Sequence, residues 1–88
     1  MNKAVIAGYS RSPFTMARKG ELIDIKPVNL LAEVIKDLVS KSKINQNDIE
    51  DVVIGCAFQV GEQCFNIGKL VTFLTGMDIK TSGMTVDR

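Results

Sequence analysis

Apolar and polar residues follow two different periods along the chain, and together they predict five elements. Three short apolar runs with β-branched side chains have the pattern of strands buried on both faces, at residues 3–9, 51–58 and 82–87. Between them, residues 27–42 and the segment between Asn66 and Gly76 carry apolar residues at helical spacing. We therefore expect the order strand, helix, strand, helix, strand.

Particular residues mark where the two helices begin and end. Pro27 fits the first turn of the first helix, which should end near Ser42 because a polar, Asn-rich stretch follows. Asn66 is the candidate N-cap of the second helix, and Gly76 occupies the position of a left-handed C-terminal cap. Gly68 lies inside that helix at a cost of about 1 kcal/mol relative to alanine, which predicts close approach of another helix or backbone.

This alternation is typical of an α/β fold with parallel strands joined by right-handed crossovers. Two helices cover a three-stranded sheet poorly, although the strands have the pattern of elements buried on both faces. The segment therefore looks incomplete alone. The polar connection at residues 10–26 is longer than usual. Such length more often indicates function or contact with a partner than a loop without a role.

Composition narrows the class of protein. A chain of 88 residues with 45% hydrophobic content is long enough for one small globular unit. Its 11 basic and 10 acidic residues give a net charge of +1, which gives no basis for a nucleic acid or an anionic membrane as partner. The apolar run after Lys3 ends at Tyr9, too early for a secretory signal, and no stretch approaches transmembrane length. The default localisation is cytoplasmic.

The chain contains two cysteines and no histidine, which argues against a zinc site and a Cys-His catalytic pair within it. Cys64, in a loop before a helix N-terminus, is the best internal candidate for a nucleophile, against the alternative of an unreactive loop cysteine. Cys56, on an apolar strand, is interpreted as packing. The spacing leaves a disulfide between them open, while a cytoplasmic protein favours two thiols. We predict no metal site.

Two further motifs do not lead to a site. Gly61, Gly68 and Lys69 lie between a strand and a helix, but six residues separate the glycines and no Ser or Thr follows the lysine, so the phosphate-loop spacing fails. Arg11 and Arg18 in the long connection could bind an anion, although a solvated or salt-bridged role is favoured for each. Nucleotide binding is therefore not expected.

Four stretches, in chain order, resemble the beginning of the thiolases, a family of acyl-CoA acyltransferases. AVIAGYSRSPF looks like the family's opening strand and its Arg-(Ser/Thr)-Pro-Phe turn, and NLLAEVIKDLV looks like its first helix. IEDVVIGCAFQVGEQCFNIGKL is similar to the second strand, an interface loop and the second helix, and GMTVDR looks like the strand that delivers the nucleophile. By this resemblance, residues 1–88 are the N-terminal part of the thiolase N-terminal domain, in a layered α/β fold with mixed sheets.

The resemblance implies a transferase of fatty acid metabolism. Its reaction would be the reversible thiolysis of a 3-ketoacyl-CoA, or in reverse the Claisen condensation of two acyl-CoA molecules, with coenzyme A as a substrate and no separate cofactor. In thiolases the acylated cysteine lies at a helix N-terminus, where the dipole lowers its pKa and backbone N–H groups can hold the thioester oxyanion. We expect this cysteine just beyond Arg88, so the segment alone should be inactive and should need the rest of the polypeptide.

The resemblance also implies a subunit interface in a homo-oligomer, a dimer or a tetramer, with the last strand pairing across a two-fold axis. The residues expected there are Gln63, Phe65, Asn66, Lys69, Thr85, Val86, Asp87 and Arg88. The chain departs from the family's pattern at Cys64, where glycine is frequent, and at Asp87, where asparagine is frequent. The alternative is a stand-alone non-catalytic α/β module that pairs with a partner through its exposed last strand.

Overall fold

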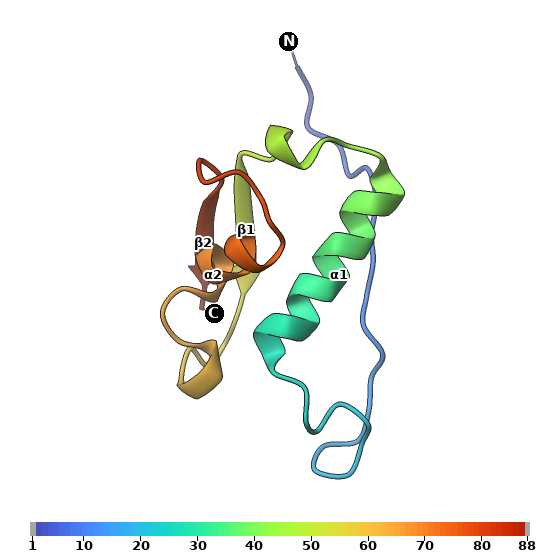
Figure 1. Ribbon diagram of the computed structural model, residues 1–88, viewed down its shortest axis with the longest axis vertical. Coiled ribbons are helices and arrows are strands. Elements are labelled where there is room, and N and C mark those ends of the chain that lie inside the picture. The colour runs from blue at the N-terminus through green and yellow to red at the C-terminus, as the bar shows by residue number, and fades with distance from the viewer. Residues whose placement is uncertain (1, 88) are drawn as a thin grey trace.

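The computed structural model describes residues 2–87, which form two α-helices and a pair of strands (Figure 1). The elements, in chain order, are α1 Pro27–Ser42, β1 Asp51–Gly55, α2 Ile67–Leu74 and β2 Ser82–Val86. Single turns of 3₁₀ helix occupy Gln46–Asp48 and Gly61–Gln63. Both predicted helices are present, α1 with the predicted bounds, and the two later apolar runs form the strands.

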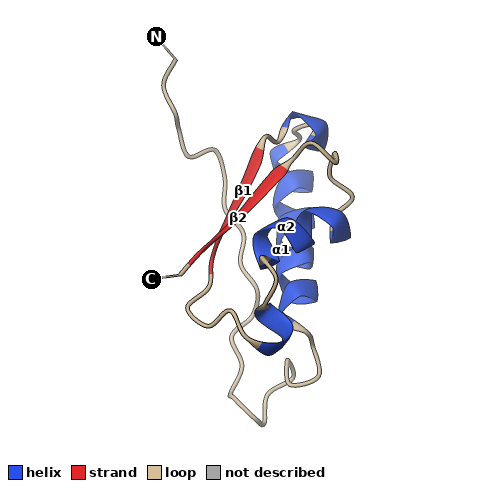
Figure 2. Cartoon of the chain, turned by 90° about the vertical axis from the view of Figure 1, so that its left-hand side faces the viewer, coloured by secondary structure: helices blue, strands red, loops and turns tan. Residues whose placement is uncertain are grey.

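The two strands are parallel, as the order of elements predicts. Val52 lies opposite Gly83 and Ile54 opposite Thr85, and α2 forms the connection between the strands. α2 lies against one face of the pair, and α1 packs on α2 from the same side (Figure 2). One face of the sheet is therefore covered, and among residues 2–87 no helix lies on the other.

This one-sided arrangement corrects the prediction that the strands are buried on both faces. Exposed and half-buried residues alternate along β1 and along β2. Val53 is 53% exposed and Met84 50% exposed, because their side chains point to the uncovered face. The apolar runs match a sheet that is enclosed on both sides, which the described residues do not supply.

The prediction of a strand at residues 3–9 is wrong for this structure. The segment is extended but forms no strand, and Val5, Ile6 and Tyr9 are 81%, 97% and 86% exposed. It runs beside α1, where Gly8 lies close to Leu38 (Figure 1). An apolar extended chain becomes a strand only where a neighbouring strand takes its backbone hydrogen bonds, and here it has not joined the edge of β1.

Hydrogen bonds attach the end of this extended segment to α1. Ser10 Oγ donates to Asp37 Oδ2 at 2.7 Å, and Lys41 Nζ lies 2.9 Å from the same oxygen. The bonds from Lys41 and Ser10 lower the pKa of Asp37, so its carboxylate stays ionised and available to the serine. The segment is therefore held by polar contacts to a helix rather than by a sheet ladder.

The core between the strands and the helices is small and partly polar. Its buried apolar residues are Ala32, Ile67, Val71 and Met77, and three threonines are buried with them, Thr72, Thr75 and Thr81. Each threonine hydroxyl donates to a nearby carbonyl oxygen, of Lys69, Val71 and Ile49 respectively. Burial of these hydroxyls is therefore compensated, as buried polar groups require.

Close backbone contact between α2 and β2 fixes their relative position. A Cβ atom at Gly68 would lie 2.5 Å from the Met84 carbonyl oxygen, and a Cβ at Gly83 would meet the backbone N and Cα of Lys69. Real Cβ atoms do not approach backbone this closely, so both positions require glycine. The close approach predicted at Gly68 is confirmed.

Replacing Gly83 should therefore separate α2 from β2. We expect Gly83→Ala to lower the free energy of unfolding by about 1–3 kcal/mol, because the new methyl group meets rigid backbone. Gly55→Ala is the matched control, since a Cβ there meets nothing within 4 Å, and its effect should stay within about 0.5 kcal/mol. Urea denaturation followed by circular dichroism measures both, and equal effects of the two substitutions would contradict the steric account.

Candidate subunit interface

The residues predicted at the interface come from two stretches that the fold brings together. The turn before α2 and the first turn of α2 lie against β2, so residues 63–69 are next to residues 83–87. Arg88, the last residue of the prediction, lies outside the described residues. The other seven lie in the turn before α2, in the first turn of α2 and at the end of β2.

The chain enters α2 through two consecutive residues in the left-handed region. Phe65 has φ +61° and Asn66 φ +58°. Asparagine tolerates this conformation, whereas for phenylalanine it is uncommon and costs free energy that the surrounding contacts must offset. The turn brings the Asn66 side chain to the helix start, where Oδ1 accepts from the Lys69 N–H at 3.4 Å. The N-cap predicted at Asn66 is thereby confirmed.

A chain of hydrogen bonds joins this helix start to β2. The Gly68 N–H donates to Thr85 Oγ1 at 3.1 Å, and the Thr85 hydroxyl donates to Asn66 Oδ1 at 2.7 Å. Asn66 Nδ2 in turn donates to the Gly83 carbonyl oxygen at 3.0 Å. Each donor has one acceptor, so Asn66 and Thr85 act together as a clamp between the helix and the strand.

The Lys69 side chain makes several contacts within the chain. Its ammonium group donates to the carbonyl oxygens of Thr81 at 2.5 Å and Ile79 at 3.3 Å, and lies 5.1 Å from the centroid of the Phe73 ring. These contacts attach the loop before β2 to α2. Charge-assisted hydrogen bonds of this kind are stronger than neutral ones.

The remaining predicted residues divide between inner and outer positions. Gln63 is half-buried, and its side-chain amide donates to the Phe58 carbonyl oxygen at 2.8 Å. Phe65 is 88% exposed, Val86 is 41% exposed, and Asp87 is exposed. These three side chains are free to meet another subunit, and the interface itself stays a prediction.

The two cysteines are free thiols occupied by local contacts. Cys64 Sγ donates to the Gly61 carbonyl oxygen at 2.8 Å, and Cys56 Sγ donates to the Phe58 carbonyl oxygen at 3.3 Å. Both thiols are engaged by carbonyl groups close to them in the chain, and the chain contains no histidine that could act as a base toward them. The geometry therefore favours the interpretation of Cys64 as an unreactive loop cysteine.

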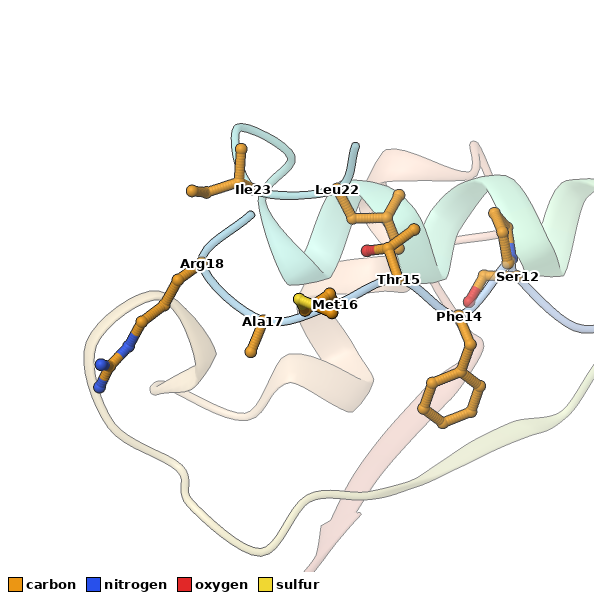
Figure 3. Close-up of a pocket in the computed structure, with 9 residues that line it drawn as sticks. Ser12, Phe14, Thr15, Met16, Ala17, Arg18, Leu22 and Ile23 are labelled. Atoms are coloured by element: carbon orange, nitrogen blue, oxygen red, sulfur yellow. The ribbon is translucent and has the colours of Figure 1, made fainter. Parts of the chain in front are cut away.

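A cavity of about 370 Å³ lies within the long connection at residues 10–26 (Figure 3). Its walls come from residues 12–18 with Leu22 and Ile23. Arg18, also with positive φ, points away from Leu22 and Ile23 and is exposed, which fits the solvated role favoured from the sequence. The walls of the cavity therefore combine apolar side chains with Ser12, Thr15 and the charged Arg18.

Two negative findings apply to the described part of the chain. Residues 2–87 hold no cluster of three or more histidine, cysteine, aspartate or glutamate side chains that could bind a metal ion. Neither of their helices is both long and apolar enough to cross a membrane.

Comparison with known proteins decides the family. The family model for the thiolase N-terminal domain matches residues 4–88. The chain belongs to the thiolase family. Among curated thiolases, it is 34% identical to the 3-ketoacyl-CoA thiolase of Marinomonas sp. strain MWYL1 over 99% of its length, and 36% and 32% identical to those of Colwellia psychrerythraea and Bacillus subtilis over 100%. It spans 22–23% of these three relatives.

A solved thiolase structure supports the fold. The Acat5 thiolase of Ascaris suum, crystallised in complex with coenzyme A, superposes with a TM-score of 0.74 at 18% identity. The superposition covers 80% of this chain and 18% of that one. The thiolase-like α/β fold expected from the sequence is confirmed.

Two residues of this thiolase segment that matter to the region were not predicted. Gly83 allows the backbone contact with α2, and the Thr81 hydroxyl ties the start of β2 to the Ile49 carbonyl oxygen at 2.9 Å. An isolated glycine in a strand pattern is a known indication of close backbone approach, so Gly83 could have been found. The sequence carried no comparable signal for Thr81.

Replacement of Lys69 should loosen the loop before β2. We expect Lys69→Met to lower the free energy of unfolding by about 1–3 kcal/mol, because two carbonyl oxygens lose a charged donor. Hydrogen exchange of residues 77–82 should quicken with it. Lys80→Met, at an exposed position of the same loop, is the control and should change stability by less than about 0.5 kcal/mol. If both variants lost the same free energy of unfolding, the hydrogen bonds of Lys69 would not contribute to stability, and the prediction would be wrong.

Proposed function

We propose that this chain is the N-terminal part of an acyl-CoA acyltransferase that catalyses the reversible thiolysis of 3-ketoacyl-CoA. One observation carries the proposal: curated 3-ketoacyl-CoA thiolases match the chain from end to end at 32–36% identity. The match includes both the turn before α2 and the strand β2, which the hydrogen bonds of Asn66 and Thr85 join. Membership of the thiolase family makes acyl transfer the expected chemistry.

The proposed reaction proceeds through a cysteine thioester. In the thiolysis direction, the cysteine gives up its proton and its thiolate attacks the C3 carbonyl carbon of the substrate. The C2–C3 bond breaks, its electron pair stays on C2, and a proton delivered there completes acetyl-CoA. The thiol of a second coenzyme A then attacks the acyl thioester, and its proton restores the cysteine thiol. The reverse sequence is a Claisen condensation.

The proposed nucleophile lies in polypeptide that continues beyond residue 88. Cys56 and Cys64 both donate to loop carbonyls, and Cys64 is separated from α2 by the left-handed turn at Phe65 and Asn66. By resemblance, β2 is the strand that leads to the acylated cysteine. The proposed role of this segment is therefore to hold that strand and to form part of the subunit interface.

The wider assignment follows the same resemblance. We propose coenzyme A as a substrate rather than a bound cofactor, a homo-oligomeric enzyme, and a place in fatty acid metabolism in the cytoplasm. Phe65, Val86 and Asp87 are the exposed candidates for contact with a second subunit.

Activity of the complete polypeptide tests this function. The open reading frame that contains these residues should continue past codon 88 into a cysteine codon, and its product should consume 3-ketoacyl-CoA only when coenzyme A is present. Replacing that cysteine with alanine should lower kcat by at least about 10³-fold, because the covalent route is lost. Loss of the 3-ketoacyl-CoA absorbance follows the reaction.

The control is the double variant Cys56→Ser and Cys64→Ser, which should keep kcat within about threefold of the parent because neither thiol takes part. A reading frame that stops at codon 88, with no thiolase-like frame nearby, would overturn the proposal and favour the stand-alone module. Loss of activity in the double variant would instead indicate that Cys56 or Cys64 is the nucleophile.

A further inference from the structure

Two side chains connect the start of α2 to the strand that leads out of this segment. Thr85 is the next-to-last residue of β2, and Asn66 is the N-cap of α2. Their hydroxyl and amide groups lie 2.7 Å apart at Thr85 Oγ1 and Asn66 Oδ1. Asn66 and Thr85 are 19 positions apart in the sequence, and they meet close to the end of the strand.

The hydrogen bonds fix the direction of each group. Thr85 Oγ1 accepts from the Gly68 N–H at 3.1 Å, so its own proton is directed to Asn66. The amide nitrogen of Asn66 is turned to the Gly83 carbonyl oxygen at 3.0 Å, so its oxygen is turned to Thr85. Reversing the amide would break both bonds, so one arrangement of these groups satisfies all the partners.

The surrounding backbone leaves little freedom for the strand to shift. Gly68 and Gly83 allow α2 and β2 into contact without intervening side chains. The two left-handed residues before the helix, Phe65 and Asn66, hold an uncommon turn in which the Asn66 side chain faces the strand. Strain of this kind is kept where surrounding contacts determine it, often close to functional sites.

We propose that Asn66 and Thr85 are positioning residues for the nucleophile: their hydrogen bonds set the place of the strand end from which the nucleophilic cysteine follows. This inference rests on the proposed function. A strand advances about 3.3 Å per residue, so the clamp holds the chain at a point within about 7 Å of Asp87, the last described residue. Reacting groups must be held to about 0.5 Å, and a displacement of 1 Å can cost about 10²-fold in rate.

The test measures acylation in the complete polypeptide. Thr85→Val keeps the shape and removes the hydroxyl, and Asn66→Ala removes the other half of the clamp. Each should lower the single-turnover acylation rate by about 10- to 100-fold while KM for 3-ketoacyl-CoA changes by less than about threefold. Thr85→Ser, which keeps the hydroxyl, should restore the rate to within about threefold of the parent.

Thr81→Val separates positioning from simple stability. Thr81 is buried and its hydroxyl bonds the Ile49 carbonyl oxygen, so this substitution also removes a hydroxyl at β2, away from the clamp. It should lower the melting temperature as Thr85→Val does and leave the acylation rate unchanged. Where Thr85→Val does not fold, Asn66→Ala at an exposed position decides the question.

The outcomes distinguish the two proposals. An active parent whose Thr85→Val or Asn66→Ala variant acylates at the parental rate would overturn the positioning role alone. An equal loss of acylation rate in Thr81→Val would also overturn it, because any weakening of the strand would then suffice. A complete polypeptide without thiolysis activity would overturn the proposed function and the positioning role together.

Discussion

The contact of two backbones, α2 against β2, is the constraint on which the rest of this structure depends. Gly68 and Gly83 have no side chains that would hold the two elements apart. The hydrogen bonds of Asn66 and Thr85 join the start of α2 to β2 beside this contact. Lys69, which follows Gly68 in α2, donates to the Thr81 carbonyl oxygen and so attaches the loop before β2 to the helix. Helix, loop and strand are thus joined by polar and backbone contacts rather than by a large apolar core.

The helices could be predicted from the sequence because their signals are local. The period of α1, Pro27 at its start, and the capping side chain of Asn66 each act within a few residues, and each matches the structure. The parallel order of β1 and β2 also followed, since a connecting helix imposes it. The glycine at position 68 predicted close approach before the approaching element was known.

The predictions of a strand at residues 3–9 and of burial on both sheet faces were wrong, because both features depend on neighbours distant in the chain. Val5 and Ile6 have the composition of a buried strand, but composition does not state which partner takes the backbone hydrogen bonds. The clamp was missed for a similar reason. Thr85 was placed at an interface by resemblance, while its bond to Asn66 depends on the exact register of helix and strand.

The three threonines buried in the core have a thermodynamic consequence. Exposure of apolar surface raises the heat capacity on unfolding, whereas exposure of polar surface lowers it. A core in which Thr72, Thr75 and Thr81 accompany four apolar residues therefore gives a small heat-capacity change. The stability of this segment should vary only gently with temperature, since Val53 and Met84 on the open face of the sheet stay about half exposed and add little apolar burial.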